Sequence, residues 1–127
     1  MDVELLINQI VDSAYRVHRA LHPGYLESVY RNALVLELSS RGMESECEVP
    51  IIVRYRGHVV GDFKADVLVE DKVILELKAV NSLHEAHEAQ LVNYLTATGI
   101  EYGLLINFGS EKVEIKRKFR TYRPKLN

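Results

Sequence analysis

The sequence contains a single cysteine, Cys47, among its 127 residues. One cysteine excludes an intrachain disulfide and is typical of proteins in a reducing compartment. Long apolar runs are also absent from the start of the chain, where Asp2 and Glu4 interrupt the apolar residues. This start predicts neither a signal peptide nor a membrane span, so we expect a cytoplasmic protein that does not enter a membrane.

An excess of either charge sign is lacking as well. The chain has 16 Lys and Arg residues against 18 Asp and Glu residues, a formal net charge of −2. This balance does not indicate a nucleic-acid binder, although net charge averages over all faces and can hide a local basic patch. There is no internal repeat and no low-complexity linker. With 47% apolar and 27% charged residues, residues 1–127 are predicted to form one globular domain with its own core.

Two helices are predicted in the first third of the chain. Apolar residues recur every three or four positions over residues 3–21, and Asp2 stands where an N-cap is expected. The sequence "HPGY" then breaks the pattern. A second helical period runs from about Tyr25 to Gly42, a residue that commonly ends helices.

After Gly42 the pattern changes to segments rich in valine and isoleucine. "CEVPIIVRYRG", "HVVGDFKADVLVE" and "KVILELKAV" predict three consecutive strands in a meander. A helix is expected at about residues 83–98, followed by strands in "EYGLLINFG" and "KVEIKRKFR". A helix between the third and fourth strands permits a parallel crossover. The predicted fold class is therefore α/β, with a mixed β-sheet flanked by α-helices.

Charged residues interrupt the third predicted strand. Strand alternation places Glu76 and Lys78 on one face, and burying either charge alone would cost several kcal/mol. If the preceding hairpin loop holds an odd number of residues, Asp66 stands directly opposite Glu76; if the number is even, the two face apart. Two such carboxylates need a cation, and Mg²⁺ prefers oxygen ligands of this kind. The alternative is a cross-strand salt-bridge ladder that includes Lys78 and Lys64.

Two helical segments carry further candidates. "GYLESVY" places Glu27 near the start of the second helix, with Tyr30 and Arg31 three and four residues later on the same face. "QLVNY" places Gln90 and Tyr94 four residues apart on one face of the third helix. Each has a structural alternative: Glu27 can complement the helix dipole, and Tyr94 can be a core aromatic.

The end of the chain is basic over residues 116–125, "KRKFRTYRPK", which has six basic residues, no acid and two aromatics. Such a segment can neutralise phosphates and stack on unpaired bases. Its alternative is a lysine-protected edge strand followed by a loose tail. The candidate nucleic-acid contacts are Lys116, Arg117, Lys118, Arg120, Arg123 and Lys125.

Taken together, these segments resemble the PD-(D/E)XK nuclease superfamily, in the exonuclease-type branch that carries a Gln-x-x-x-Tyr motif. More narrowly, the chain is similar over about residues 3–120 to the small GxxExxY protein family, which it matches at Gly24, Glu27 and Tyr30 and in "VILELKAV", "EAQLVNYL" and "GLLINFG". The proline of the superfamily's Pro-Asp pair is replaced by Ala65, which is not a ligand position. The resemblance implies a restriction-endonuclease-like fold.

The resemblance also implies a metal site. Asp66, Glu76 and the backbone carbonyl of Leu77 would bind Mg²⁺, for which Mn²⁺ can substitute, and Glu27 would add an acid from the helix side. The metal-dependent chemistry would be phosphodiester hydrolysis.

The remaining motif residues would assist that reaction. Lys78 would position or deprotonate the attacking water, and Gln90 and Tyr94 would orient the lysine or contact substrate. We expect a nuclease that acts on DNA rather than RNA, with a homodimer or a partner protein extending its binding surface. The alternative is a non-catalytic module on the same fold that binds nucleic acid or protein.

Overall fold

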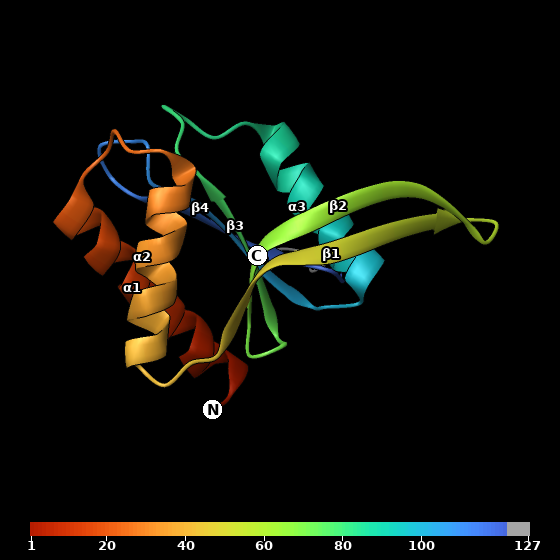
Figure 1. The fold of residues 1–127 in the computed structure, drawn as a ribbon, viewed down its shortest axis with the longest axis horizontal. Helices are drawn as coiled ribbons and strands as arrows, with labels where there is room; N and C mark the ends of the chain where they lie inside the picture. The colour runs from red at the N-terminus through yellow and green to blue at the C-terminus, as the bar shows by residue number, and fades with distance from the viewer. Residues whose placement is uncertain (122–127) are drawn as a thin grey trace, which may run out of the picture.

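A computed structural model describes residues 1–121, and its order of elements is the one that the sequence predicts (Figure 1). Among the described residues, no helix combines the length and the apolar character needed to cross a membrane. Arg123 and Lys125 of the predicted basic segment lie outside the described residues. The elements are α1 (Val3–Leu21), α2 (Glu27–Ser40), β1 (Ser45–Tyr55), β2 (His58–Val69), β3 (Val73–Lys78), α3 (Glu85–Thr98), β4 (Tyr102–Asn107) and β5 (Glu114–Phe119).

The strands form one five-stranded sheet in the order β1-β2-β3-β4-β5. Strands β3 and β4 run parallel and are joined by α3, whereas the other neighbours are antiparallel. This confirms the predicted three-strand meander, the crossover helix and the mixed sheet.

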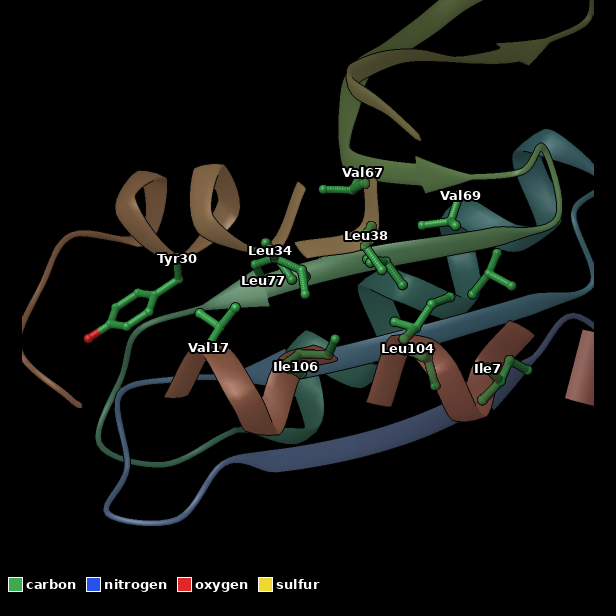
Figure 2. Packing of buried hydrophobic residues seen from close by; sticks show 14 of the residues in the cluster. Ile7, Val17, Tyr30, Leu34, Leu38, Val67, Val69, Leu77, Leu104 and Ile106 are labelled. Atoms are coloured by element: carbon green, nitrogen blue, oxygen red, sulfur yellow. The ribbon is translucent and has the colours of Figure 1, made fainter. Parts of the chain in front are cut away.

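Helices cover both faces of the sheet. On one face, α1 and α2 pack on the central strands, and Figure 2 shows this core at close range. On the other face, α3 packs on the sheet through Leu91 and Leu95, which meet Ile74 and Leu105. Alternation along β3 therefore sends Leu75 and Leu77 to the α1–α2 side and Ile74 and Glu76 to the α3 side.

A side-chain cap and a glycine turn determine where the first two helices begin. The Asp2 carboxylate accepts a hydrogen bond from Leu5 N at 3.0 Å and caps α1, as predicted. Helix α2 begins at Glu27, two residues later than expected. Gly24 adopts a φ of 126° that favours glycine, and Leu26 is still extended.

The outer part of the β1–β2 hairpin, residues 49–65, extends beyond the rest of the sheet, and we call it the hairpin arm (Figure 1). Ala65 and Leu68 have opposite parity in β2, yet both pack in the core beneath α3. The strand therefore changes face between them. At this level the register places Glu48, with a left-handed φ of 53°, opposite Asp66.

Candidate active site

The hairpin between β2 and β3 brings the two predicted carboxylates together. Its loop, residues 70–72, holds an odd number of residues. The register pairs Val67 with Leu75, so the next pair along the ladder is Asp66 with Glu76. Of the two arrangements that the sequence permits, the structure has the one in which these side chains share a face.

Backbone groups of both strands hold the two carboxylates. Asp66 Oδ2 accepts a hydrogen bond from Leu77 N at 2.8 Å, and Glu76 Oε1 accepts one from Asp66 N at 3.2 Å. The Glu76 side chain is buried, with 4% of the residue exposed, and Asp66 is half-buried. The backbone hydrogen bonds between β2 and β3 end at the pair Val67 and Leu75. Beyond this pair, the two carboxylates accept the hydrogen bonds of the backbone N–H groups.

Burial and mutual repulsion govern the charge of this pair. Burial raises the pKa of Glu76 to about 8, with a further contribution from the Asp66 charge, and Lys78 opposes the shift. Burial also raises the pKa of Asp66, against the lowering effects of the Leu77 N–H group and of Lys78. Because two carboxylates this close do not both ionise readily, the pair favours either a shared proton or a bound cation.

Lys78 lies near both carboxylates but does not form the predicted alternative, a salt-bridge ladder. Within residues 1–121, no ion pair joins Lys78 or Lys64 to Asp66 or Glu76. The charge of Lys78 nevertheless lowers the pKa of both carboxyl groups. Lys78 thus lies two residues after Glu76 on the same face of β3 and forms no ion pair with either carboxylate within residues 1–121.

Glu27 approaches the pair from the start of α2. Burial and the charge of Asp66 raise the pKa of Glu27, whereas Lys78 and Arg31 lower it. Glu27 is exposed at the start of α2. Among the described residues it forms no metal-holding group with Asp66 and Glu76, so its role as a further acid of the site stays a prediction.

Tyr30 does not share that location, contrary to the expected common face with Glu27. It is fully buried, and its ring stacks on Phe108 with centroids 4.9 Å apart. Its hydroxyl donates to His22 O at 2.5 Å and accepts from Tyr25 N at 3.2 Å. Residues three positions apart on a helix do not point in the same direction. Tyr30 therefore faces the core, and the hydrogen bonds of its hydroxyl hold the loop before Glu27 in place.

The two candidate residues of α3, Tyr94 and Gln90, have different surroundings. Tyr94 is buried in the core beneath α3, and burial and the charges of Glu76 and Asp66 raise the pKa of its phenol. Gln90 lines the groove between α3 and the hairpin arm together with Tyr94. Among the described residues, Gln90 makes no hydrogen bond to Lys78, and its predicted orienting role stays a prediction.

Arg31 is a site residue to which the sequence assigned no role. Its Nη1 atom lies 3.3 Å from Glu48 Oε1, and its Nε atom is buried without a hydrogen-bond partner in the described part of the chain. Its charge lowers the pKa of both Glu27 and Asp66. The signal for it was present in the sequence, because Arg31 lies one helical turn after Glu27.

Asn107 is a second residue that the sequence did not single out. It is fully buried at the end of β4, and its side chain binds Val80 through N–H···O bonds of 3.0 Å and 2.9 Å. Its Nδ2 also donates to Glu114 Oε1 at 2.9 Å. Together with the bond from Phe108 N to Lys78 O at 2.8 Å, these contacts fix the chain directly after Lys78. A buried asparagine within the apolar "GLLINFG" was the available signal.

Three of the four described basic residues of the C-terminal segment are engaged in ion pairs. These pairs partly neutralise the predicted basic patch, while Lys116 is exposed and forms no ion pair within residues 1–121. The paired residues are Arg117 with Glu4, Lys118 with Glu88 and Arg120 with Glu101.

Among the described basic residues of the C-terminal segment, Lys116 is the one that lies in register with Glu76 across the sheet. The register aligns Glu76 with Leu105 and Leu105 with Lys116, so Lys116 lies on the same sheet face as Glu76. Two strand spacings separate them, about 10 Å. The assignment of this segment to nucleic-acid binding stays a prediction.

The donor atoms at the site suit a hard cation. They are carboxylate oxygens on buried backbone supports, with no thiol or imidazole among the predicted ligands. Among the described residues, no group of three or more His, Cys, Asp or Glu side chains is arranged to hold a metal. Mg²⁺ commonly binds through one or two carboxylates and keeps several waters, so the pair Asp66 and Glu76 fits this ion.

The fold and the site define a class of protein: a mixed α/β domain in which a central hairpin carries a buried and a half-buried carboxylate, Glu76 and Asp66, and a lysine, Lys78. A family model of the PD-(D/E)XK nuclease superfamily matches residues 4–118. The chain belongs to the PD-(D/E)XK nuclease superfamily. This membership agrees with the restriction-endonuclease-like fold.

One solved structure has a similar fold at low sequence identity. The crystal structure of SSO0001 matches with a TM-score of 0.57 and 21% sequence identity. The match covers 73% of this chain and 50% of that chain, so the present chain corresponds to half of the matched protein's length. Among curated proteins, none matches significantly.

Proposed function

We propose that this protein is a small metal-dependent nuclease that hydrolyses phosphodiester bonds in DNA. The observation that carries the proposal is the Asp66–Glu76 pair, buried, held by backbone N–H groups and faced by Lys78. A buried pair of like charges is costly to a fold unless a cation uses it. The proposed ligands are Asp66, Glu76 and the Leu77 carbonyl, with Glu27 as a further acid and Mg²⁺ or Mn²⁺ as the ion.

Each side chain has a defined part in the proposed reaction. When bound, the metal would supply the Lewis acidity that activates a water and neutralises charge on the phosphate. Asp66 and Glu76 would give up their shared proton to bind it. Lys78 would position the attacking water as an ammonium or, in its neutral amine form, accept the proton of that water. Arg31 would add a second positive charge on the α2 side, next to Glu27.

The finer family placement is also a proposal. Gly24, Glu27 and Tyr30 occur together where the GxxExxY motif requires them, and each has a distinct structural part: a turn, a site acid and a buried clamp. Tyr94 beside the carboxylate pair supports the branch with the Gln-x-x-x-Tyr motif. A cytoplasmic location is consistent with the exposed free thiol of Cys47.

A cleavage assay tests the proposed function. Labelled single-stranded DNA, duplex DNA and RNA are incubated with the protein in Mg²⁺, Mn²⁺ or EDTA, beside Glu76→Ala and Lys78→Ala variants. We expect cleavage of DNA with either metal, none in EDTA, and a loss of at least about 100-fold in each variant. Activity that persists in EDTA or survives both substitutions would refute the mechanism.

Matched controls come from the same hairpin. Asp62 and Lys64 are exposed residues of β2, so Asp62→Asn and Lys64→Ala alter charge without touching the carboxylate pair, and both should keep wild-type activity. Failure to bind Mg²⁺ or Mn²⁺, together with DNA binding that is unchanged in all variants, would favour a non-catalytic binding module instead.

A further inference from the structure

A large groove separates α3 from the hairpin arm, and we call it the α3 groove. Its volume is about 1020 Å³. It is hollow because α3 presents small side chains along this side, Ala86, Ala89 and Ala97, opposite the Phe63 ring of the arm. The hairpin arm and α3 thus form two walls of a channel that is open to solvent.

The groove lies on the same side of the sheet as the carboxylate site, because α3 packs on the face of β3 that carries Ile74 and Glu76. Gln90 and Tyr94 line it, and Tyr94 packs in the same core cluster as Ile74, the β3 residue two positions before Glu76. A polymer with one phosphodiester at the carboxylate pair would therefore have the groove on the same side of the sheet for its neighbouring residues.

The charge of the groove suits a polyanion. Within the described part of the chain, Arg54 is the charged residue of its lining, and no Asp or Glu is part of it. A second hollow of about 550 Å³, next to the α2–β1 connection, differs in this respect. Four acidic residues line that second hollow, and they would repel phosphates: Glu44, Glu46, Glu70 and Asp71.

The groove also offers what unpaired bases require. The Phe63 ring lies 5.7 Å from the Tyr94 ring at 42° and is 43% exposed, although large aromatic side chains are usually covered. An exposed ring can stack on any base. The amides of Gln90 and Asn93 can both donate and accept hydrogen bonds at base edges.

We propose that the α3 groove binds a single strand of nucleic acid through its unpaired bases, with Phe63 as the stacking surface. Paired bases in a duplex stack on one another and do not present their faces to a side chain, so the groove discriminates against duplex DNA. The inference rests on the proposed function in naming that strand as the substrate, and it makes single-stranded DNA, or a single-stranded end, the preferred form.

Fluorescence anisotropy with labelled oligothymidylate tests the proposal. The measurements use a Glu76→Gln background with Mg²⁺, in which the strand is bound without being cut. Phe63→Ala should weaken binding of the single strand by about 5- to 150-fold. Phe63→Trp should restore it, whereas Phe63→Leu should not. The control is Val60→Ala, a 63% exposed apolar residue of the same strand outside the groove, which should bind as the background does.

The outcomes separate this inference from the nuclease proposal. Equal single-strand binding by Phe63→Ala and Val60→Ala would overturn the groove even if the wild-type protein cleaves DNA. A specific loss in Phe63→Ala would support the groove even if the wild-type protein cleaves nothing. Sedimentation provides a further decision: a dimer that Phe63→Ala dissociates, with DNA binding unchanged, would assign the groove to self-association and contradict the proposal.

Discussion

Glu76 is the residue whose chemistry conflicts most with its surroundings. Its neighbours on β3 are buried aliphatics, each of which stabilises the fold by about 1.5–3 kcal/mol when it leaves water. A carboxylate at such a position opposes folding when it is charged, and the nearby Asp66 increases that cost. The site is therefore expected to reduce the stability of the protein in the absence of metal.

Replacing Glu76 by glutamine should change how stability depends on pH. The pKa of Glu76 rises from its ordinary value of 4.5 to about 8 on folding, so the folded state binds more protons between these values. The free energy of unfolding should then fall as pH rises from about 4.5 to about 8. Glu76→Gln should flatten this slope and exceed the wild type in free energy of unfolding above pH 8 by on the order of 5 kcal/mol. Urea denaturation in EDTA at several pH values measures the free energy of unfolding of the wild type and of the variant.

The control for this prediction is Glu46→Gln, which alters an exposed glutamate of β1 and should keep the wild-type slope. A Glu76→Gln variant that loses stability with pH as steeply as the wild type would contradict the assigned ionisation.

At this scale the sequence predicted part of the site. Strand alternation placed Glu76 and Lys78 on one face, and the odd hairpin loop was one of two arrangements left open. Arg31 and Asn107 received no role because their importance depends on tertiary partners: Glu48 lies on another element, and Val80 lies 27 positions away from Asn107 in the chain. No local pattern encodes such contacts.

Among the elements, the start of α2 determines where Glu27 lies. Gly24 makes the turn before the helix, and the buried Tyr30 hydroxyl binds two backbone groups of the same loop. The clamp and the acid lie on the same helix, within one turn. The orientation of Glu27 is therefore tied to the packing of Tyr30 against Phe108.

Removing the Tyr30 hydroxyl should loosen this helix start. Tyr30→Phe loses two hydrogen bonds, so the free energy of unfolding should fall by about 1–3 kcal/mol. DNA cleavage should also fall, because Glu27 is held less firmly, while Mg²⁺ still binds at Asp66 and Glu76. Tyr15→Phe, an exposed tyrosine of α1, is the control. Unchanged stability and activity in Tyr30→Phe would refute the clamp.

The elements themselves were predicted better than their connections. Helical periodicity and segments rich in valine and isoleucine identified all eight elements in order. The late start of α2 and the change of face in β2 were not predicted. Both depend on left-handed or extended backbone at single residues, such as Gly24 and Glu48, and tertiary packing decides these conformations.

At the scale of the molecule, the sheet separates two cores and leaves the site at their boundary. The α1–α2 core supports β3 from one side, and the α3 core supports it from the other. Glu27 arrives from α2, Tyr94 from α3, and the carboxylate pair from the hairpin between them. An arrangement that gathers acids from separate layers requires the whole fold, which explains why the isolated motifs were individually weak signals.

The most direct test of the central claim is a calorimetric titration of the wild-type protein with Mg²⁺ at pH 7. The titration is repeated in two buffers of different ionisation enthalpy, so that the number of protons released can be measured. Because the pKa of Glu76 is raised to about 8, this carboxyl group holds a proton at pH 7 that an incoming ion displaces, and we expect release of about one proton per Mg²⁺. Glu76→Gln should abolish that release, and the surface control Asp62→Asn should retain it. Mg²⁺ binding without proton release, or with the same release in Glu76→Gln, would contradict the claim that Mg²⁺ displaces a proton from the carboxylate pair.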